Sequence, residues 1–313
     1  NYLEDDGASI EPVCYMPTMP LLLINGSKGI GTGFSTNVPC FNPADIKSNL
    51  LKLMNAKDPG NVALTEMVPW YDSFLGNINK TDKNKWSTHG IYKVTRNKVH
   101  VTELPIGTWT NDYIEFLKKL ETNGEIQRYD DYSSDSKVDI QVTFGPAAIR
   151  ELVHTKKLAG LLKLQGSLSA TNLHVLDYTR QIVKLDTPED VIRMFYSVRL
   201  EFYVKRKAYL EKRTKHELNI LENKIRFIES VSNNEIVLYG VKKVDTLAKL
   251  TKDKYYLWKK DSDKTGLQYL LDIKCDAFTK EKVALLALEI QKKQAYLEST
   301  ESQTPKDMWK KDL

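Results

Sequence analysis

The sequence predicts an α+β chain, in which an irregular Pro/Gly-rich segment and an α+β domain precede a long antiparallel helical coiled-coil arm with a small helical cap. Three observations predict this fold class. Proline and glycine punctuate residues 11–41, apolar and polar residues alternate within 69–144, and apolar residues recur every three or four positions from 188 onward. Because 313 residues exceed one ordinary core, two or three domains are expected.

The first segment, residues 11–41, is expected to form a packed platform of irregular structure, because its many punctuators interrupt any long helix. One amphipathic helix is expected directly after it. Pro43 suits the first turn of that helix. The apolar residues that follow at helical spacing are Ile46, Leu50, Leu53 and Met54.

The middle region, about 69–144, is expected to form an α+β domain. Residues 98–102 and 138–144 alternate between apolar and polar side chains, which predicts half-buried strands. Between these strands, apolar residues at helical spacing predict a helix over about 110–124.

The strongest helix start of the chain lies at residues 186–190, where a capping residue, a first-turn proline and two acids follow one another. Without glycine or proline before Asn233, the helix would run for roughly 65 Å at 1.5 Å per residue. We therefore expect an arm. A small cap at about 233–278 precedes a second periodic stretch that could return antiparallel, with apolar residues at Val283, Leu286, Ile290 and Leu297.

Charge and hydropathy indicate a chain without membrane-spanning helices, and they do not identify a binding partner. The net charge of +5 and the pI near 8.8 permit a nucleic-acid partner but do not demand one. The longest apolar runs fall far short of the ~20 residues of a membrane helix. The acidic first residues are no signal peptide and resemble a cut made inside a longer protein.

Cysteine and histidine show no pattern typical of metal sites or of nucleophilic catalysis. Cys14, Cys40 and Cys275 are far apart, which indicates neither zinc nor a disulfide framework and favours a reducing, intracellular compartment. No chemistry is assigned to the histidines at 89, 100, 174 and 216. The aspartates at 130, 131 and 135 are interpreted as a solvated loop.

Trp70 and Trp109 are expected to be core aromatics, because no interleaved basic stripe accompanies them as in a platform that stacks single-stranded nucleic acid. A short basic run at His154, Lys156 and Lys157 could extend a nucleic-acid surface. A solvated helix face is the simpler interpretation of that run.

A glycine cluster at residues 25–35, Asn-Gly-Ser-Lys-Gly-Ile-Gly-Thr-Gly-Phe-Ser, invites a nucleotide-binding interpretation. It lacks the terminal Gly-Lys-Ser/Thr order of a phosphate loop and the glycine spacing of a dinucleotide site. Taken by itself, the cluster favours a tight glycine turn that packs Ile30 into a core.

Several ordered segments together resemble the type IIA DNA topoisomerases, most closely their eukaryotic and viral branch. The resemblance begins in residues 11–20, Glu-Pro-Val-Cys-Tyr-Met-Pro-Thr-Met-Pro, followed by the glycine cluster. It continues in segments 69–76 (PWYDSFLG), 102–110 (TELPIGTWT), 163–168 (KLQGSL), 199–207 (RLEFYVKRK) and 305–309 (PKDMW). These matches span nearly the whole chain. One departure is Phe34, where cellular eukaryotic members usually carry tryptophan, and it makes a viral or phage source plausible.

The resemblance implies a DNA-binding role for the glycine cluster. In the family, the isoleucine between paired glycines wedges between base pairs of the gate DNA and helps to kink it, and this residue corresponds to Ile30. An apolar wedge unstacks a base step, and the resulting bend brings more protein surface to the backbone. Gly29 and Gly31 would let the main chain approach DNA closely. Lys28 would meet phosphate, or remain a solvated surface charge.

A second set of DNA contacts is implied at Lys163, Gln165 and Ser167, whose family counterpart lies against the gate DNA. Polar and cationic side chains of this kind fix the register on phosphates without reading base sequence. The alternative interpretation of this stretch is an exposed strand.

The resemblance also implies three domains with separate roles. Residues 1–60 would finish the winged-helix DNA-binding region, 61–185 would form the tower that braces bent DNA, and 186–313 the coiled-coil arm whose cap closes the exit gate as a homodimer. The expected partners are double-stranded DNA, a second copy of the chain and the remaining topoisomerase domains.

The catalytic tyrosine, the Mg²⁺ site and the ATPase would lie in other parts of the full enzyme, so we expect this chain to bind no cofactor and to be inactive alone. We expect it inside the cell, in the nucleus of a eukaryote or in a host cell for a virus or phage. The competing hypothesis is a non-catalytic DNA-architectural or coiled-coil interaction protein.

Overall fold

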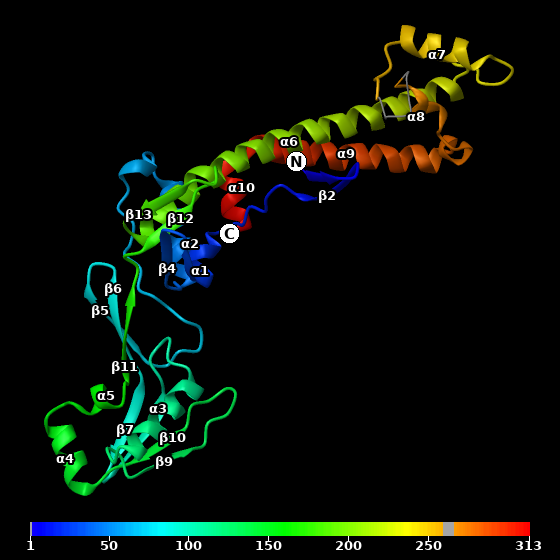
Figure 1. The fold of residues 1–313 in the computed structure, drawn as a ribbon. Coiled ribbons are helices and arrows are strands. Elements are labelled where there is room, and N and C mark those ends of the chain that lie inside the picture. Colours follow the sequence, from blue (N-terminus) through cyan, green and yellow to red (C-terminus); the bar gives the residue numbers. More distant parts are fainter. Residues whose placement is uncertain (1, 259–265) are drawn as a thin grey trace. The chain divides into compact units, whose positions relative to one another are not determined.

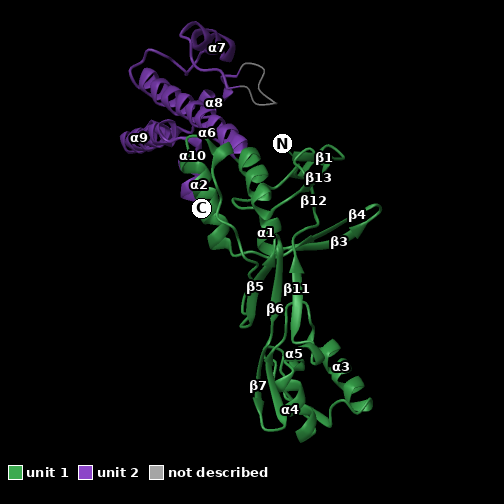
Figure 2. Ribbon diagram, turned by 90° about the vertical axis from the view of Figure 1, so that its left-hand side faces the viewer, with its two compact units in different colours: residues 1–199, 313 green, residues 200–312 purple. Residues whose placement is uncertain are grey.

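The computed structural model of the chain describes residues 2–258 and 266–313. These residues form two compact units, one of residues 1–199 with 313 (unit 1) and one of residues 200–312 (unit 2), as Figure 2 shows. Each unit contains its own cluster of buried apolar side chains. The finer division expected from the sequence, with boundaries at about 60 and 185, stays a prediction.

Unit 1 begins with paired strands. β1 (Tyr2–Asp5) and β2 (Ala8–Pro12) form one antiparallel hairpin. After the short helix α1 (Leu21–Asn25), β3 (Ser27–Gly31) and β4 (Phe34–Val38) form another. The expected irregular platform at 11–41 is therefore wrong in part, because the cross-strand hydrogen bonds between β3 and β4 give residues 27–38 a regularity that their residue pattern does not show.

Helix α2 (Pro43–Asn55) confirms the amphipathic helix expected after the platform. The Asn42 side chain accepts a hydrogen bond from the Ala44 N–H, and proline occupies the first turn, so the helix start is capped as its sequence favours. All four apolar residues expected on one face are buried. The Asn49 side chain, buried among them, exchanges two hydrogen bonds with the Thr65 backbone, at 2.9 and 2.8 Å.

A four-stranded antiparallel sheet, in the order β7-β8-β10-β9, confirms the α+β character of the middle region. Its strands are β7 (Ile91–Thr95), β8 (Lys98–Glu103), β9 (Arg128–Asp131) and β10 (Ile140–Thr143). The helices beside it are α3 (Thr110–Thr122), α4 (Pro146–His154) and α5 (Leu158–Leu161). The inward residues of β8 and β10 pack against α3 in one core, which includes Val99, Val101, Leu117, Ile140 and Val142.

Two smaller sheets complete unit 1 (Figure 1). The order of the three-stranded sheet is β11-β6-β5, made of β5 (Asn77–Asp82), β6 (Lys85–His89) and β11 (Gln165–Ser169). β12 (Leu173–Leu176) pairs with β13 (Ile182–Leu185). β12 also lies beside β4, to which the backbone of Asn172 is bridged at Asn37.

Four residues of unit 1 are placed otherwise than expected. Trp109 is 75% exposed and Trp70 is 40% exposed, so neither is a core aromatic. Trp109 immediately precedes α3 with extended backbone, and this places its side chain outside the packed face of that helix. Asp130 and Asp131 lie on β9 rather than in a loop, and the Arg128 guanidinium pairs with the Asp130 carboxylate. Asp135 is exposed in a turn, as expected.

Helix α6 (Pro188–Ser232) has 45 residues and confirms the long helix. Thr187 and Asp190 cap its start reciprocally: Thr187 N–H donates to the Asp190 carboxylate at 2.9 Å, and Asp190 N–H donates to Thr187 Oγ1 at 3.2 Å. This exchange satisfies two backbone donors at the start of the helix. Among the helices in the described part of the chain, none combines the length and the apolar composition that a membrane span needs.

Unit 2 confirms the return of a second helix along α6. The helices after α6 are α7 (Lys243–Lys252), α8 (Gln268–Leu271), α9 (Lys280–Ser302) and α10 (Pro305–Asp312). The ammonium groups of Lys215 and Lys293 on opposite helices bind carboxylates at 2.7 and 2.5 Å, on Glu301 and Glu217 respectively. Between α6 and α9 the cap has its own core, with Phe227, Ile236, Leu250, Leu267 and Leu270. Residues 259–265 of the predicted cap lie outside the described residues.

Candidate nucleic-acid interface

The β3–β4 hairpin presents Ile30 to solvent. Ile30 is 94% exposed, so the interpretation of the glycine cluster as a turn that packs this side chain into a core is wrong. Its direct partner across the hairpin is Ser35, and Gly31 pairs with Phe34 at the end of the two strands. Gly33 has a φ of 79° in the connecting turn, a conformation that favours glycine, so the sequence closes the hairpin locally.

The two glycines that flank Ile30 are not required by the fold. A Cβ added at Gly29 would meet nothing within 4 Å, and one added at Gly31 would lie 3.8 Å from the nearest atom, the Phe34 carbonyl oxygen. Neither has a positive φ, unlike Gly26, where a Cβ would lie 2.8 Å from the Val38 carbonyl oxygen. Glycine weakens a strand, and a strand glycine that the fold does not require is typical of a site where a ligand or another backbone approaches closely.

Lys28 belongs to the same exposed surface. It lies two residues before Ile30 on β3, and alternate residues of a strand share a face. Its side chain is exposed, and its partner across the hairpin is Asn37. The structure therefore brings together the four hairpin residues predicted from the sequence, which are Lys28, Gly29, Ile30 and Gly31.

The predicted residues of the second set lie on and before β11. Gln165 and Ser167 are exposed and share one face of that strand, paired with His89 and Ser87 of β6. Ser169, next on the same face, accepts a hydrogen bond on its carbonyl oxygen from Asn37 Nδ2 at 3.5 Å. The end of β11 is thereby joined to the hairpin that carries Ile30.

Lys163 has a partner inside the protein. Its ammonium nitrogen lies 4.2 Å from the centre of the Phe116 ring, a cation–π contact. Its φ of 49° turns the chain into β11, and the turn is held by the Tyr113 hydroxyl, which donates to the Leu162 carbonyl at 2.9 Å. Burial raises the pKa of that hydroxyl far above its ordinary value, so it stays a donor.

The sequence patterns did not predict a role for Asn172, just before β12, or for His174, on β12. The Asn172 amide donates to Ser35 Oγ at 2.6 Å, and His174 Nδ1 lies 3.0 Å from the Ser35 carbonyl oxygen. The His174 ring also meets the Phe34 ring edge to face, at 5.8 Å between centres. No local signal could have found these contacts, since 137 and 139 residues separate their partners.

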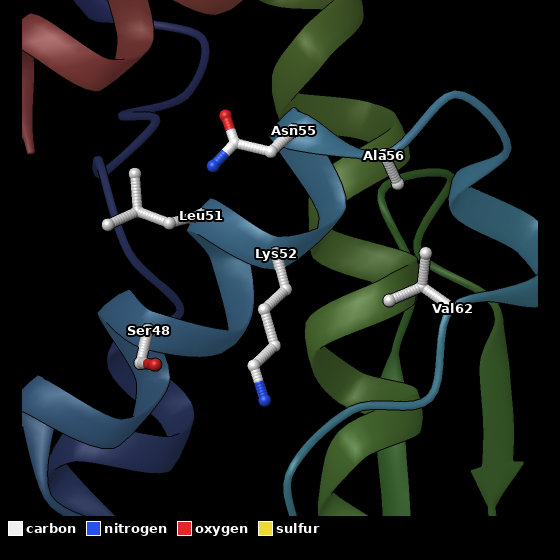
Figure 3. Close-up of a pocket in the computed structure, with 6 residues that line it drawn as sticks. All are labelled: Ser48, Leu51, Lys52, Asn55, Ala56 and Val62. Atoms are coloured by element: carbon white, nitrogen blue, oxygen red, sulfur yellow. The ribbon is translucent and has the colours of Figure 1, made fainter.

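Other charged or hollow parts of unit 1 supply no comparable arrangement. The basic run His154, Lys156 and Lys157 is exposed at and after the end of α4, as the solvated-face interpretation expected. A shallow hollow beside α2 is lined by Leu51, Lys52 and their neighbours (Figure 3), and the Lys52 ammonium already binds the Thr65 hydroxyl. Within residues 2–258 and 266–313, no three His, Cys, Asp or Glu side chains are grouped as a metal site requires.

Comparisons with known proteins agree on one family. A sequence model of the family of DNA gyrase/topoisomerase IV A-type subunits matches residues 1–313. The mitochondrial DNA topoisomerase 2 of Dictyostelium discoideum is 33% identical over 317 residues, which cover 100% of this chain and 24% of that protein. DNA topoisomerase 2 of Acanthamoeba polyphaga mimivirus is 28% identical over 378 residues, covering 99% of this chain and 29% of that protein.

A solved structure shares the fold. The crystal structure of the Plasmodium falciparum topoisomerase II DNA-binding, cleavage and re-ligation domain matches with a TM-score of 0.88 and 32% identity. The match covers 99% of this chain and 45% of that one. The chain thus spans under a third of the length of the two curated relatives, at 24% and 29%.

Proposed function

The chain belongs to the DNA gyrase/topoisomerase IV family, the type IIA DNA topoisomerases, and on this premise we propose that it supplies the DNA gate and exit gate of an ATP-dependent type II enzyme. In this role unit 1 binds and bends the duplex that is to be opened. Unit 2 joins a second copy of the chain and closes the exit through which the passed duplex leaves. The alternative, a non-catalytic architectural protein, is not favoured by the comparisons.

The single observation that carries the DNA-bending proposal is an isoleucine 94% exposed on a hairpin, between two glycines that the fold does not need. An exposed aliphatic side chain gains about 1.5–3 kcal/mol when it leaves water. Unstacking a base step costs a few kcal/mol, which insertion of the side chain and the contacts made by bent DNA offset. The bare backbone at Gly29 and Gly31 allows the hairpin to approach the bases closely.

We propose that the polar residues around this wedge hold the DNA backbone. Lys28 lies on the face of Ile30, and Gln165 and Ser167 line the face of β11 that leads to the hairpin. Their donors suit phosphate oxygens and read no base sequence. Lys163 would act from the turn before β11, where Phe116 holds its ammonium group.

A cluster of exposed apolar residues in the cap supports the exit-gate proposal. Val237, Tyr239 and Val244 are 53%, 86% and 73% exposed; the first two lie between α6 and α7, and Val244 lies in the first turn of α7. Exposed apolar residues of this kind would suit a two-fold contact, in which the same surface of two copies meets. The contact must open reversibly, so we expect it to be small.

The chemistry of strand cleavage would come from elsewhere in the enzyme. The described residues group no acids or histidines that fit Mg²⁺, so no step is assigned to a metal here. We propose that the nucleophilic tyrosine, the Mg²⁺ site and the ATPase belong to other segments. The isolated 313-residue chain would then relax no supercoiled DNA. Its place of action would be the compartment that holds the DNA, the nucleus in a eukaryote or the host cell for a virus.

Binding to a ~30 base-pair duplex labelled at both ends for energy transfer tests the DNA-gate proposal. We expect the wild type to bend the duplex and Ile30→Ala to lose the bend while keeping most of its affinity, which falls with added salt because phosphate contacts remain. Leu75→Ala is the matched control, since Leu75 is 73% exposed and lies outside the hairpin. Equal bending by Ile30→Ala and Leu75→Ala would refute the wedge.

A further inference from the structure

The strand that carries Ile30 follows α1 along the chain and, among the described strands, pairs only with β4. β4 is bridged to the segment before β12: the Asn37 N–H donates to the Asn172 carbonyl at 2.9 Å. A two-stranded hairpin by itself is marginal in water, so its direction depends on what holds it. The contacts of β4 with Asn172 and His174 therefore bear on where the wedge points.

Both side chains contact Ser35, the residue directly opposite Ile30. Ser35 Oγ accepts a hydrogen bond from the Asn172 amide at 2.6 Å, and the Ser35 carbonyl oxygen lies 3.0 Å from His174 Nδ1. Residues directly opposite in an antiparallel pair have Cα atoms about 5 Å apart. A displacement of Ser35 is thus passed to Ile30 across one pair of strands.

The hydrogen on His174 is assigned by its neighbours. Nδ1 lies 3.0 Å from the Ser35 carbonyl oxygen and 2.7 Å from Asn172 Oδ1, and both of these atoms only accept. Nδ1 must therefore carry the hydrogen and share it between them. The same orientation of Asn172 leaves its amide nitrogen free to donate to Ser35 Oγ, so the three side chains satisfy one another.

We propose that His174 and Asn172 are positioning residues, which fix β4 at Ser35 and so set the direction in which Ile30 enters DNA. The inference rests on the proposed DNA-bending function and deepens it. The edge-to-face contact of His174 with Phe34 adds a second point of attachment, at the residue opposite Gly31. The contacts of His174 and Asn172 with Ser35 and Phe34 are called the brace. Neither residue needs to touch DNA, because the brace acts through the hairpin.

Three substitutions of His174 separate its hydrogen bond from its ring. In His174→Asn the amide nitrogen occupies the place of Nδ1, so the donor is kept and the ring is lost. His174→Gln places its donor near the position of Nε2, and His174→Phe keeps a ring without a donor. One hydrogen bond contributes about 0.5–1.5 kcal/mol net, so losing it changes a two-state population by roughly two- to twelvefold.

Two readouts are made on the full chain, after equal melting temperatures show that each variant is folded. Hydrogen exchange of the Asn37 amide, without DNA, reports whether β4 stays attached to Asn172. Energy transfer on the doubly labelled duplex reports the bent fraction. We expect His174→Asn, which keeps the donor and loses only the ring contact with Phe34, to stay closest to the wild type in both readouts. We expect His174→Gln and His174→Phe to exchange faster and bend less DNA, each by about two- to twelvefold.

The outcomes are distinguishable. Equal exchange rates in all four proteins, or a His174→Asn protein that behaves like His174→Gln, overturn the brace. Faster exchange with unchanged bending also overturns it, because the brace would then not direct Ile30. Ile30→Ala is measured alongside: if it too bends DNA like the wild type, the proposed function has failed, whereas a loss of bending confined to Ile30→Ala refutes the brace alone.

Discussion

Gly29→Ala separates a requirement of the fold from a requirement of DNA binding. The added Cβ would meet no atom of the protein within 4 Å, and the backbone there does not have a positive φ. Alanine is about 0.5–1 kcal/mol better than glycine in a strand, so we expect the stability of the variant to equal or exceed that of the wild type. Any loss of function then reflects an external partner.

The expected loss follows from close packing. A methyl group forced into a well-packed contact costs about 1–3 kcal/mol, which corresponds to roughly five- to 150-fold in an equilibrium constant. We expect the bent fraction or the affinity for the labelled duplex to fall by a factor in this range. Thermal melting of the same protein, without DNA, should show no loss of stability.

Two other glycines serve as controls. Gly160→Ala also adds a Cβ with nothing within 4 Å, on α5, so its stability should equal or exceed that of the wild type and its DNA binding should be unchanged. Gly26→Ala should lower the melting temperature, because φ is 67° and the Cβ would lie 2.8 Å from a backbone oxygen. If Gly29→Ala binds and bends DNA as Gly160→Ala does, the glycines do not serve DNA approach and the reasoning is refuted.

Three further predictions concern unit 2 and the cysteines. Tyr239→Asp should weaken self-association by about ten- to a hundredfold in sedimentation equilibrium, because it would bury a charge at an apolar contact. Tyr209→Asp is the control, since Tyr209 is an exposed tyrosine on α6 (61%) outside the cap, and equal effects of the two substitutions would contradict a dimer contact in the cap. The Lys293 ammonium holds the pKa of Glu217 below its ordinary value. The resulting stabilisation is complete above about pH 4.3, the pKa of an unfolded glutamate, and is lost as the pH falls through the lower pKa that Glu217 has in the folded protein. Below pH 5, the melting temperature of the wild type should therefore fall more steeply than that of Glu217→Gln. Parallel curves would refute this. Burial raises the pKa of the Cys40 thiol, so Cys40 should react with maleimide more slowly at pH 8 than the exposed Cys14 and Cys275. Peptide mapping of the labelled protein measures the three rates, and equal rates would contradict this prediction.

The sequence predicted the elements that depend on local patterns. The capping residues and the unbroken period of α6, the apolar face of α2 and the alternation in β8 and β10 are all confirmed. Patterns of this kind record which side chains must face a core, and neighbours within a few residues determine them. Trp70 and Trp109 were wrongly expected in the core, because a single aromatic residue has no period to show its face.

The candidate site divides in the same way. The hairpin residues Lys28 to Gly31 are consecutive, so the sequence and its family resemblance identified them together. Ile30 is solvent-exposed only because of where β3 and β4 lie, and the glycine cluster by itself favoured the opposite. The contacts of Asn172 and His174 with Ser35 join residues that are 137 and 139 positions apart in the sequence, so no local pattern could predict them.

By itself, the sequence predicted the long helix, the amphipathic helix and the alternating strands, the family, and Ile30 as the candidate wedge, because each depends on neighbouring residues. The tertiary structure alone decided which side chains are exposed, which glycines the fold can do without, and what holds the hairpin. Those properties depend on contacts between segments brought together by folding, and the free energy of such contacts has no counterpart in a local pattern.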